Sequence, residues 1–332
     1  MIRSTTAPSA VAPVVAYQLE AANRALFAAH GSRPKVIDCT GQPAWLPPSG
    51  ANAIFTFISA WWKAPAEPPP GWPFDVRWIQ LASAGADAVP RWAYQGVTVT
   101  CSRGITAAPI AEYVINVVID REKRLSEVRV ASRAEALRLR DEELWRAMAL
   151  GGVKGKTLGL VGLGAISREV AIRAHAFGMK VTAIRRSNTP SSLDFVEMRR
   201  DIHALVADCD HLVLCAPATA QTTGLINDAV LGGAKPGMHL VNVSRGKLVD
   251  HAALSRALTS GKVGYATLDV TEPEPLPDGH EFYHHPNVRL TPHVAWYSPN
   301  HHERLTGQII QNLDRFARGE PLDNVVDPNT GY

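Results

Sequence analysis

Three short segments carry side chains that could together reduce a carbonyl group. Their polar residues are Arg245 in VNVSRG, the carboxylates Asp269, Glu272 and Glu274 in LDVTEPEP, and His293 in LTPHVAW. A guanidinium can hold a substrate carboxylate and polarise its carbonyl, and an imidazole can protonate the developing alkoxide. A carboxylate beside the imidazole would keep it charged and oriented. Each residue type is common alone, so the prediction depends on the three segments meeting at one place.

A glycine-rich turn precedes these segments and stands between an apolar run and a helical pattern. The run TLGLV leads into Gly162-Leu163-Gly164-Ala165-Ile166-Ser167. Gly162 would allow a tight turn, Gly164 would let backbone amides approach a pyrophosphate, and the helix N-terminus would supply unpaired N–H groups. Ser167 takes the place of a third glycine and is small enough for close contact between helix and strand. A turn that binds nothing is the alternative, and the strand–turn–helix context favours a dinucleotide site.

The residues after the next predicted strand bear on which dinucleotide binds. NAD sites usually carry Asp or Glu about 20 residues beyond the turn, where it accepts hydrogen bonds from the ribose. Here KVTAI ends in Arg185-Arg186-Ser187-Asn188, and no carboxylate appears before Asp194. Guanidinium forks and a hydroxyl suit a 2′-phosphate. NADP is therefore favoured, and NAD remains open because these arginines could simply be exposed.

The composition is that of a folded protein of about two domains. The 332 residues include 34 Lys+Arg against 31 Asp+Glu, with a net charge of +3 and 46% apolar residues. This near balance predicts no nucleic-acid partner. No apolar run approaches the roughly 18 residues of a membrane span, so no membrane partner is expected. The four cysteines lack CxxC spacing, which favours a reducing compartment, and the cytoplasm is the expected location.

Strand and helix patterns alternate along the chain, as in α/β proteins. Before Ile110, short apolar runs between Pro/Gly-rich loops predict a small parallel-sheet domain. A helical pattern from Ile110 to about Trp145 predicts a long connector that is apolar first and of mixed charge later. After Gly152, nearly continuous apolar strands alternate with helices, which predicts a sheet covered on both faces. The amphipathic segment ERLTGQIIQNLDRFARGE could return to the first domain.

Seven segments together resemble the D-isomer-specific 2-hydroxyacid dehydrogenases over nearly the whole chain. They are WIQLASAGAD, TAAPIAEYVI, GKTLGLVGLGAI, PATAQTTGLIN, LVNVSRGKLVD, TLDVTEPEPLP and LTPHVAW. The resemblance implies two Rossmann-like, doubly wound parallel-sheet domains, with the dinucleotide domain inserted into a flavodoxin-like substrate domain. Residues 1–103 and 299–332 would form the substrate domain, and residues 104–298 would form the NAD(P)-binding domain. It also implies a homodimer and catalysis in the interdomain cleft.

The resemblance assigns roles within the catalytic site. It implies that Arg245 binds the substrate and that His293 is the acid/base. Glu274, which precedes Pro275, would be the carboxylate partner of His293. The Ala84-Gly85 turn would offer backbone N–H groups to the substrate carboxylate.

The resemblance likewise implies contacts to the cofactor beyond the glycine turn and Arg185. Asp269 would contact the nicotinamide carboxamide. The other implied neighbours of the cofactor are Ala216, Pro217, Thr222, Val243 and Ser244.

The chain also departs from the family pattern at Arg185 and carries an unusual aromatic residue at 296. Arg185 stands where NAD-using members carry an acidic residue, which favours the NADP-using glyoxylate/hydroxypyruvate-reductase-like branch. Trp296 resembles a tryptophan that lies near the substrate in glycerate dehydrogenases and C-terminal-binding-protein corepressors. There it would favour apolar or ring-bearing 2-keto acids; the alternative is a core or interface residue.

The expected function is a reductase of a small 2-keto or 2-hydroxy acid, with hydride transfer from the nicotinamide. The alternative is a dinucleotide-sensing interaction protein of the corepressor kind, in which cofactor occupancy sets assembly. The lack of long disordered tails favours the enzyme, and turnover of NADPH with a keto acid discriminates between the two. No metal is expected, because His284-His285 and His301-His302 lack a completing set of ligands.

Overall fold

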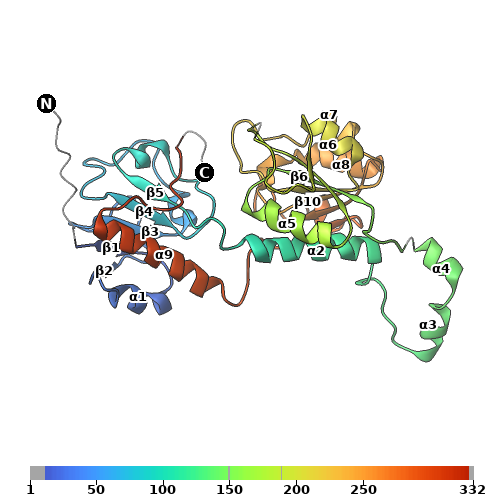
Figure 1. Cartoon of the computed structure of the whole chain (residues 1–332), viewed down its shortest axis with the longest axis horizontal. Coiled ribbons are helices and arrows are strands. Elements are labelled where there is room, and N and C mark those ends of the chain that lie inside the picture. The colour runs from blue at the N-terminus through green and yellow to red at the C-terminus, as the bar shows by residue number, and fades with distance from the viewer. Residues whose placement is uncertain (1–11, 149, 188, 329–332) are drawn as a thin grey trace. The chain divides into compact units, whose positions relative to one another are not determined.

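A computed structural model describes residues 12–148, 150–187 and 189–328 and shows two compact units (Figure 1). The described residues up to Thr106, together with those from Ser298 onward, form unit 1. Residues Ala107–Tyr297 form unit 2. Each unit is built around one parallel sheet, so the predicted architecture of two parallel-sheet α/β domains is confirmed.

Unit 1 has a five-stranded parallel sheet in the order β2-β1-β3-β4-β5. Its strands are β1 (Val14–Tyr17), β2 (Lys35–Asp38), β3 (Ala53–Thr56), β4 (Trp78–Leu81) and β5 (Thr98–Thr100). Its helices are α1 (Ala21–Ala28), α9 (His301–Arg318) and the 3₁₀ turns η1 (Ile58–Trp61) and η2 (Arg91–Tyr94). The predicted amphipathic segment forms α9, and its apolar side packs on the sheet through Leu305, Ile309 and Leu313.

Unit 2 has a seven-stranded parallel sheet in the order β12-β11-β10-β9-β6-β7-β8. Its strands are β6 (Thr157–Val161), β7 (Lys180–Ile184), β8 (Val196–Met198), β9 (His211–Leu214), β10 (Met238–Asn242), β11 (Val263–Leu268) and β12 (Val288–Leu290). Its helices are α2 (Ala107–Lys123), α3 (Arg133–Arg138), α4 (Glu142–Ala147), α5 (Ala165–Ala176), α6 (Ile202–Asp208), α7 (Asp228–Gly232), α8 (His251–Thr259), η3 (Gly246–Leu248) and η4 (Glu281–Tyr283).

The sheet of unit 2 is buried on both faces. One hydrophobic cluster packs α2 and α5 against one face, and a second packs α6, α7 and α8 against the other. Strands covered twice carry apolar side chains at most positions, which is why these strands read as nearly continuous apolar runs. Because all the strands are parallel, their carboxyl ends meet at one edge, and the loops after them carry the predicted chemistry of this unit.

The helix expected from Ile110 to about Trp145 is shorter than predicted. Helix α2 ends at Lys123, and Arg124 takes a left-handed backbone conformation with φ of 49°. The following segment projects from the rest of unit 2 and carries the short helices α3 and α4 (Figure 1). Ser132 and Asp141 cap these helices by accepting hydrogen bonds from backbone N–H groups. Because these capping residues begin new helices, a single helix does not extend from α2 through α3 to α4.

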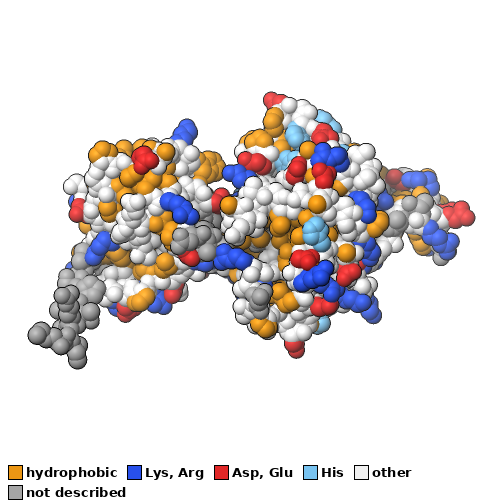
Figure 2. All heavy atoms as spheres, turned by 90° about the horizontal axis from the view of Figure 1, so that it is seen from above, with side chains coloured by type: hydrophobic (Ala, Val, Ile, Leu, Met, Phe, Trp, Pro, Cys, Tyr) orange, Lys and Arg blue, Asp and Glu red, His pale blue; other side chains and the backbone are white. Residues whose placement is uncertain are grey.

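The surface of unit 2 carries charges of both signs. On the face drawn in Figure 2, Lys and Arg side chains are interspersed with Asp and Glu rather than gathered into one basic patch. Mixed charges of this kind cancel at a distance, so this face presents no extended field of one sign. Within the described ranges, no helix is long and apolar enough to cross a membrane.

Candidate active site

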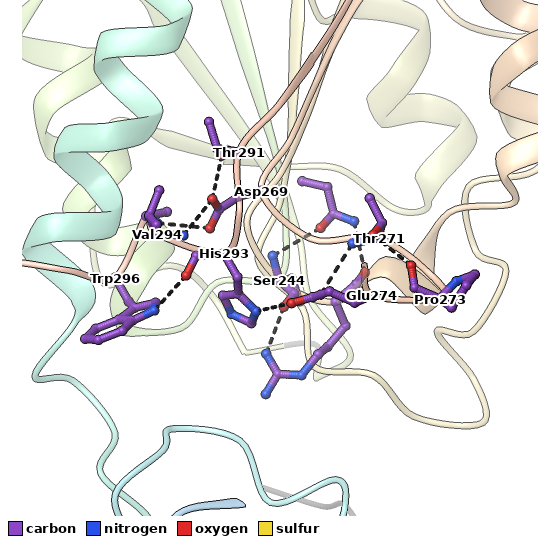
Figure 3. Close-up of polar contacts among 12 residues, drawn as sticks. Ser244, Asp269, Thr271, Pro273, Glu274, Thr291, His293, Val294 and Trp296 are labelled. Carbon is purple, nitrogen blue, oxygen red and sulfur yellow. Dashed lines mark hydrogen bonds and ion pairs between the residues drawn. The ribbon is translucent and has the colours of Figure 1, made fainter. Parts of the chain in front are cut away.

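An imidazole and a carboxylate form the centre of the site. Nδ1 of His293 lies 2.7 Å from Oε1 of Glu274, and the two side chains point toward each other (Figure 3). Both remain open to solvent, with 42% and 41% of their side-chain surface exposed. Because Glu274 occupies Nδ1, the opposite ring nitrogen, Nε2, is the one that can meet a substrate oxygen.

Glu274 stays ionised at neutral pH. Partial burial alone would raise the pKa of Glu274, but the hydrogen bond and the charge of His293 outweigh burial. The backbone N–H of Thr271 and the charge of Arg245 add to this, so the pKa of Glu274 lies below its usual value. An ionised carboxylate only accepts hydrogen bonds, so Nδ1 of His293 must be the donor in the pair. Any proton that His293 gives to a substrate therefore leaves from Nε2.

The backbone around His293 is held in a tight turn that exposes the imidazole. His293 has a φ of 53°, a conformation that residues other than glycine seldom adopt. Its N–H donates to the carbonyl oxygens of Asp269 and Thr291 at 2.9 and 3.0 Å. The indole N–H of Trp296 donates to the carbonyl oxygen of His293 at 2.8 Å.

The carboxylate of Asp269 ties the same turn down. It is 2% exposed and accepts from the backbone N–H groups of Val294 and Ala295 at 2.9 and 3.0 Å (Figure 3). The hydroxyl of Thr291 donates to the same carboxylate at 2.5 Å. The sequence resemblance implied a nicotinamide contact for Asp269; within the protein, its oxygens hold the loop that carries His293.

Arg245 reaches the site from the loop after β10. Asn242, fully buried at the end of that strand, donates to the carbonyl oxygen of Arg245 at 2.9 Å and accepts from the N–H of Ser244 at 3.1 Å. The guanidinium of Arg245 is half-buried and donates to the carbonyl oxygen of Ser244. Its charge helps to lower the pKa of Glu274. The guanidinium of Arg245 and the imidazole of His293, from distant segments, thus both act on the carboxylate of Glu274.

Gly246 makes this convergence possible. A Cβ at Gly246 would lie 2.0 Å from the carbonyl carbon of Thr271 and 2.1 Å from its oxygen. The loops after β10 and β11 are therefore in direct backbone contact, which leaves no room for any side chain. This contact places Arg245 beside the segment that carries Glu274.

The glycine turn after β6 has the shape of a phosphate cradle. Gly162 has a φ of 91°, and a Cβ there would approach the backbone of Ala216 to 3.1 Å. Gly164 precedes α5 with no side-chain cap, and a Cβ on it would meet no atom within 4 Å. The first N–H groups of this twelve-residue helix have no side-chain cap, and the space next to Gly164 is open. A pyrophosphate fits there because those donors and the helix dipole favour an anion.

Ser167, which replaces the third glycine, supports the turn directly. It is fully buried, and its hydroxyl donates to the carbonyl oxygen of Gly162 at 2.7 Å. The sequence predicted only that this residue would be small enough for helix–strand contact. Ala165 and Ile166 form the first turn of α5 beside it.

The loops after β9 and β10 are joined beside the glycine turn. Ser244 donates through its hydroxyl to the carbonyl oxygen of Ala216, and Thr222 donates to that of Pro217 at 2.7 Å. Ala216 and Val243 are nearly buried, at 8% and 7% exposure. These residues, expected from the resemblance to flank the cofactor, lie on the same edge of the sheet as Gly162.

Arg185 leaves the adjacent strand at the level of the glycine turn. Ile184, the last residue of β7, pairs with Val161, and its carbonyl oxygen accepts from the N–H of Gly162 at 2.9 Å. Arg185 is half-buried, whereas Arg186 and Ser187 are exposed. Asn188, the last residue of the predicted set, lies outside the described residues.

Ala84 and Gly85 belong to unit 1, where they follow β4. Both are half-buried, and the hydroxyl of Ser83 donates to the carbonyl oxygen of Gly85 at 2.8 Å. Elsewhere, no group of three His, Cys, Asp or Glu side chains suited to a metal occurs among the described residues.

The sequence analysis did not identify two residues that position the site. Asn242 closes an apolar run, HLVN, and such a polar residue at the end of a buried strand is a usable signal. Thr291 stands in LTPHVAW, but its hydrogen bonds to Asp269 and to Tyr113 join segments far apart in sequence. No local pattern predicts those contacts.

The sequence is similar to known oxidoreductases. A family model described as D-isomer specific 2-hydroxyacid dehydrogenase, NAD binding domain, matches residues 123–295. A glycerate dehydrogenase from Methylorubrum extorquens is 31% identical over 257 residues, which are 76% of this chain and 79% of that protein. A glyoxylate reductase from Thermococcus litoralis is 32% identical over 235 residues, which are 70% of this chain and 71% of that protein.

The fold is similar to solved structures of the same kind. The NADPH-dependent glyoxylate/hydroxypyruvate reductase from Sinorhizobium meliloti, solved with NADP and sulfate, superimposes with a TM-score of 0.75 at 26% identity. The match covers 97% of this chain and 100% of that one.

Proposed function

Because the chain belongs to the D-isomer-specific 2-hydroxyacid dehydrogenase family and is an oxidoreductase of 2-hydroxy acids, we propose that it reduces glyoxylate, hydroxypyruvate or a related small 2-keto acid. The observation that carries this proposal is the 2.7 Å contact between Nδ1 of His293 and Oε1 of Glu274. The charge of Arg245 also acts on Glu274 and helps to lower its pKa. The names of the glycerate and glyoxylate relatives point to the same substrates.

The three side chains have complementary roles in this reaction. When bound, the nicotinamide supplies the hydride for the keto carbon. Arg245 binds the substrate carboxylate and polarises the carbonyl. His293 gives the proton on Nε2 to the oxygen that becomes the hydroxyl, while Glu274 accepts from Nδ1 and keeps the ring oriented. The Ala84-Gly85 turn contributes backbone N–H groups to the substrate carboxylate.

Unit 2 is proposed as the dinucleotide domain and unit 1 as the substrate domain, with NADP preferred over NAD. The cradle of Gly162 and Gly164 suits the pyrophosphate. Arg185 leaves β7 beside that cradle, where a guanidinium can pair with a ribose 2′-phosphate. Asp269 at the end of β11 would then accept from the carboxamide. The NADP complex of the Sinorhizobium relative supports the same preference.

A matrix of keto acids and cofactors tests these proposals together. Glyoxylate, hydroxypyruvate and phenylpyruvate are each offered with NADPH and with NADH, and kcat/KM is measured for every pair. We expect turnover of at least one small keto acid and about tenfold or greater preference for NADPH. A preference for phenylpyruvate over glyoxylate would indicate that the Trp296 ring contacts the bulky side chain of the substrate. No turnover of any 2-keto acid would overturn the proposed function.

Arg185→Asp isolates the cofactor preference. A carboxylate at this position repels a 2′-phosphate and accepts from ribose hydroxyls, so we expect the preference to shift toward NADH by about tenfold or more. Arg200→Asp makes the same change of charge on an exposed residue of unit 2 and serves as the control. An unchanged preference in Arg185→Asp would remove this residue from the cofactor site.

We further propose a cytoplasmic homodimer. The four cysteines are free thiols, which suits a reducing compartment. The segment after α2 exposes large apolar side chains, including Leu125 at 72%, Leu137 at 58% and Trp145 at 42%. Apolar groups on a projecting segment favour burial against a second copy of the chain.

A further inference from the structure

A chain of hydrogen bonds connects helix α2 to the carboxylate that holds the catalytic turn. The phenol oxygen of Tyr113 lies 2.7 Å from the hydroxyl of Thr291, which in turn lies 2.5 Å from Oδ1 of Asp269. A carboxylate only accepts, so the single hydroxyl proton of Thr291 goes to Asp269. Tyr113 must then be the donor to Thr291. The two hydrogen bonds therefore run in one direction, from the phenol of Tyr113 to the carboxylate of Asp269, and each bond polarises the next.

The carboxylate at the end of this chain determines where the imidazole lies. Asp269 accepts from the N–H groups of Val294 and Ala295, the two residues that follow His293 (Figure 3). The positive φ of His293 is unfavourable for a side chain with a Cβ, so the turn persists only while its hydrogen bonds hold it. An Asp269 carboxylate that rotates would release this turn and move the imidazole.

Tyr113 is well suited to hold that carboxylate. Its ring packs into the core formed by α2 and α5, so the phenol oxygen has a fixed position. Burial raises the pKa of Tyr113 to about 12, so the phenol remains a donor at any working pH. Two helical turns further along α2, Asp120 pairs with Arg289 of β12 at 2.8 Å. Helix α2 is thus bonded to Arg289 in β12 and to Thr291 just after it, in the segment that leads into the turn at His293.

We propose that Tyr113 and Thr291 are positioning residues for His293, which act through Asp269 and make no contact with the substrate themselves. This inference rests on the proposed function, in which His293 is the acid. Loss of the Tyr113 phenol leaves Thr291 and Asp269 in place with one fewer hydrogen bond. The imidazole then samples positions outside the productive one, and the chemical step slows.

Tyr113→Phe and Thr291→Val test the proposal in the full-length protein. Tyr113→Phe removes one neutral hydrogen bond, which corresponds to about a three- to tenfold fall in kcat, with KM for the keto acid within about twofold of wild type. Thr291→Val removes that bond and the bond to the Asp269 carboxylate, so its fall in kcat should be larger. Thr291→Ser keeps the hydroxyl and should restore kcat. Tyr17→Phe is the matched control, because that buried phenol donates to a backbone carbonyl in unit 1 at 2.8 Å. Equal kcat in wild type and Tyr113→Phe, or an equal loss in Tyr17→Phe, would overturn the proposal.

Hydrogen exchange separates this inference from the proposed function. We expect the amides of Val294 and Ala295 to exchange faster in Tyr113→Phe than in wild type. In Tyr17→Phe they should exchange at the wild-type rate. This readout needs no substrate. If the wild-type protein reduces no 2-keto acid, the proposed function fails, while unchanged exchange in Tyr113→Phe makes the positioning role itself wrong.

Discussion

In the proposed reaction, Glu274 decides which ring nitrogen of His293 can give a proton to the substrate. Its Oε1 accepts from Nδ1 at 2.7 Å, so the proton available to a substrate is the one on Nε2. The sequence offered three candidate carboxylates, Asp269, Glu272 and Glu274, and it was the family resemblance that pointed to Glu274 as the partner of His293. In the structure Asp269 is buried under the turn, and Glu274 is the carboxylate on the ring.

The lowered pKa of Glu274 predicts how its contribution to stability depends on pH. A carboxyl group whose folded-state pKa is depressed stabilises the folded protein above its unfolded-state value. That contribution is lost as pH falls through the folded-state pKa. We therefore expect Glu274→Gln to unfold at a lower temperature than wild type at pH 7, and the difference to shrink as the pH falls below the unfolded-state value and through the lowered folded-state pKa of Glu274.

Thermal unfolding followed by circular dichroism between pH 3 and 8 measures this difference. The side chain of Glu274 is 41% exposed, so solvent screening keeps the effect small. Glu272→Gln, two residues away and exposed, is the control. A difference between Glu274→Gln and wild type that is as large at pH 3 as at pH 7 would contradict the assigned ion pair.

Strands and their loops were easier to predict than the contacts between them. Apolar runs such as TLGLV and HLVL appear as β6 and β9, because burial on both faces leaves little choice of residue. The short strand β8 and the end of α2 at Lys123 were not predicted. The first has only three residues, and the second depends on caps that start α3 and α4.

Gly246 provides a test at the level of these loops. Replacement by Ala puts a methyl group 2.0 Å from the Thr271 carbonyl carbon, so the loops after β10 and β11 must separate. We expect Gly246→Ala to lose about 1–3 kcal/mol of unfolding free energy and at least tenfold in kcat, because Arg245 moves away from Glu274. Chemical denaturation and steady-state kinetics measure both.

Gly232→Ala is the control for that experiment. Gly232 is the last residue of α7, and a Cβ there meets no atom within 4 Å. Its stability and kcat should stay near those of wild type. Wild-type kinetics in Gly246→Ala would show that the contact between the two loops does not place Arg245.

For the molecule as a whole, the parallel direction of the strands in each sheet could be predicted from the alternation of strands and helices. The return of α9 to unit 1 was suggested by its amphipathic pattern, and its apolar side packs there. Which residues belong together in the site was not accessible in the same way. The meeting of Gly246 with Thr271, or of Tyr113 with Thr291, depends on strand order, which no local pattern encodes.

The exposed apolar side chains on the projecting segment with α3 and α4 predict a homodimer. A homodimer has a mass of about 72 kDa, twice 35.9 kDa. We expect sedimentation equilibrium to give this mass for wild type and to shift toward the monomer for Leu137→Asp, which places a charge on the exposed apolar face. Leu26→Asp changes a similarly exposed leucine of α1 and should remain dimeric. A monomeric wild type would contradict the proposed assembly.

We propose that Glu274 acts on the reaction only through His293. A double-mutant cycle of kcat for hydroxypyruvate reduction by NADPH tests it most directly, with wild type, Glu274→Gln, His293→Ala and the double variant. We predict about a tenfold loss for Glu274→Gln and a loss on the order of 10²–10⁴ for His293→Ala. The double variant should then match His293→Ala within about twofold. Full turnover in His293→Ala would show that His293 is not the acid, and losses that simply multiply in the double variant would show that Glu274 acts independently of His293.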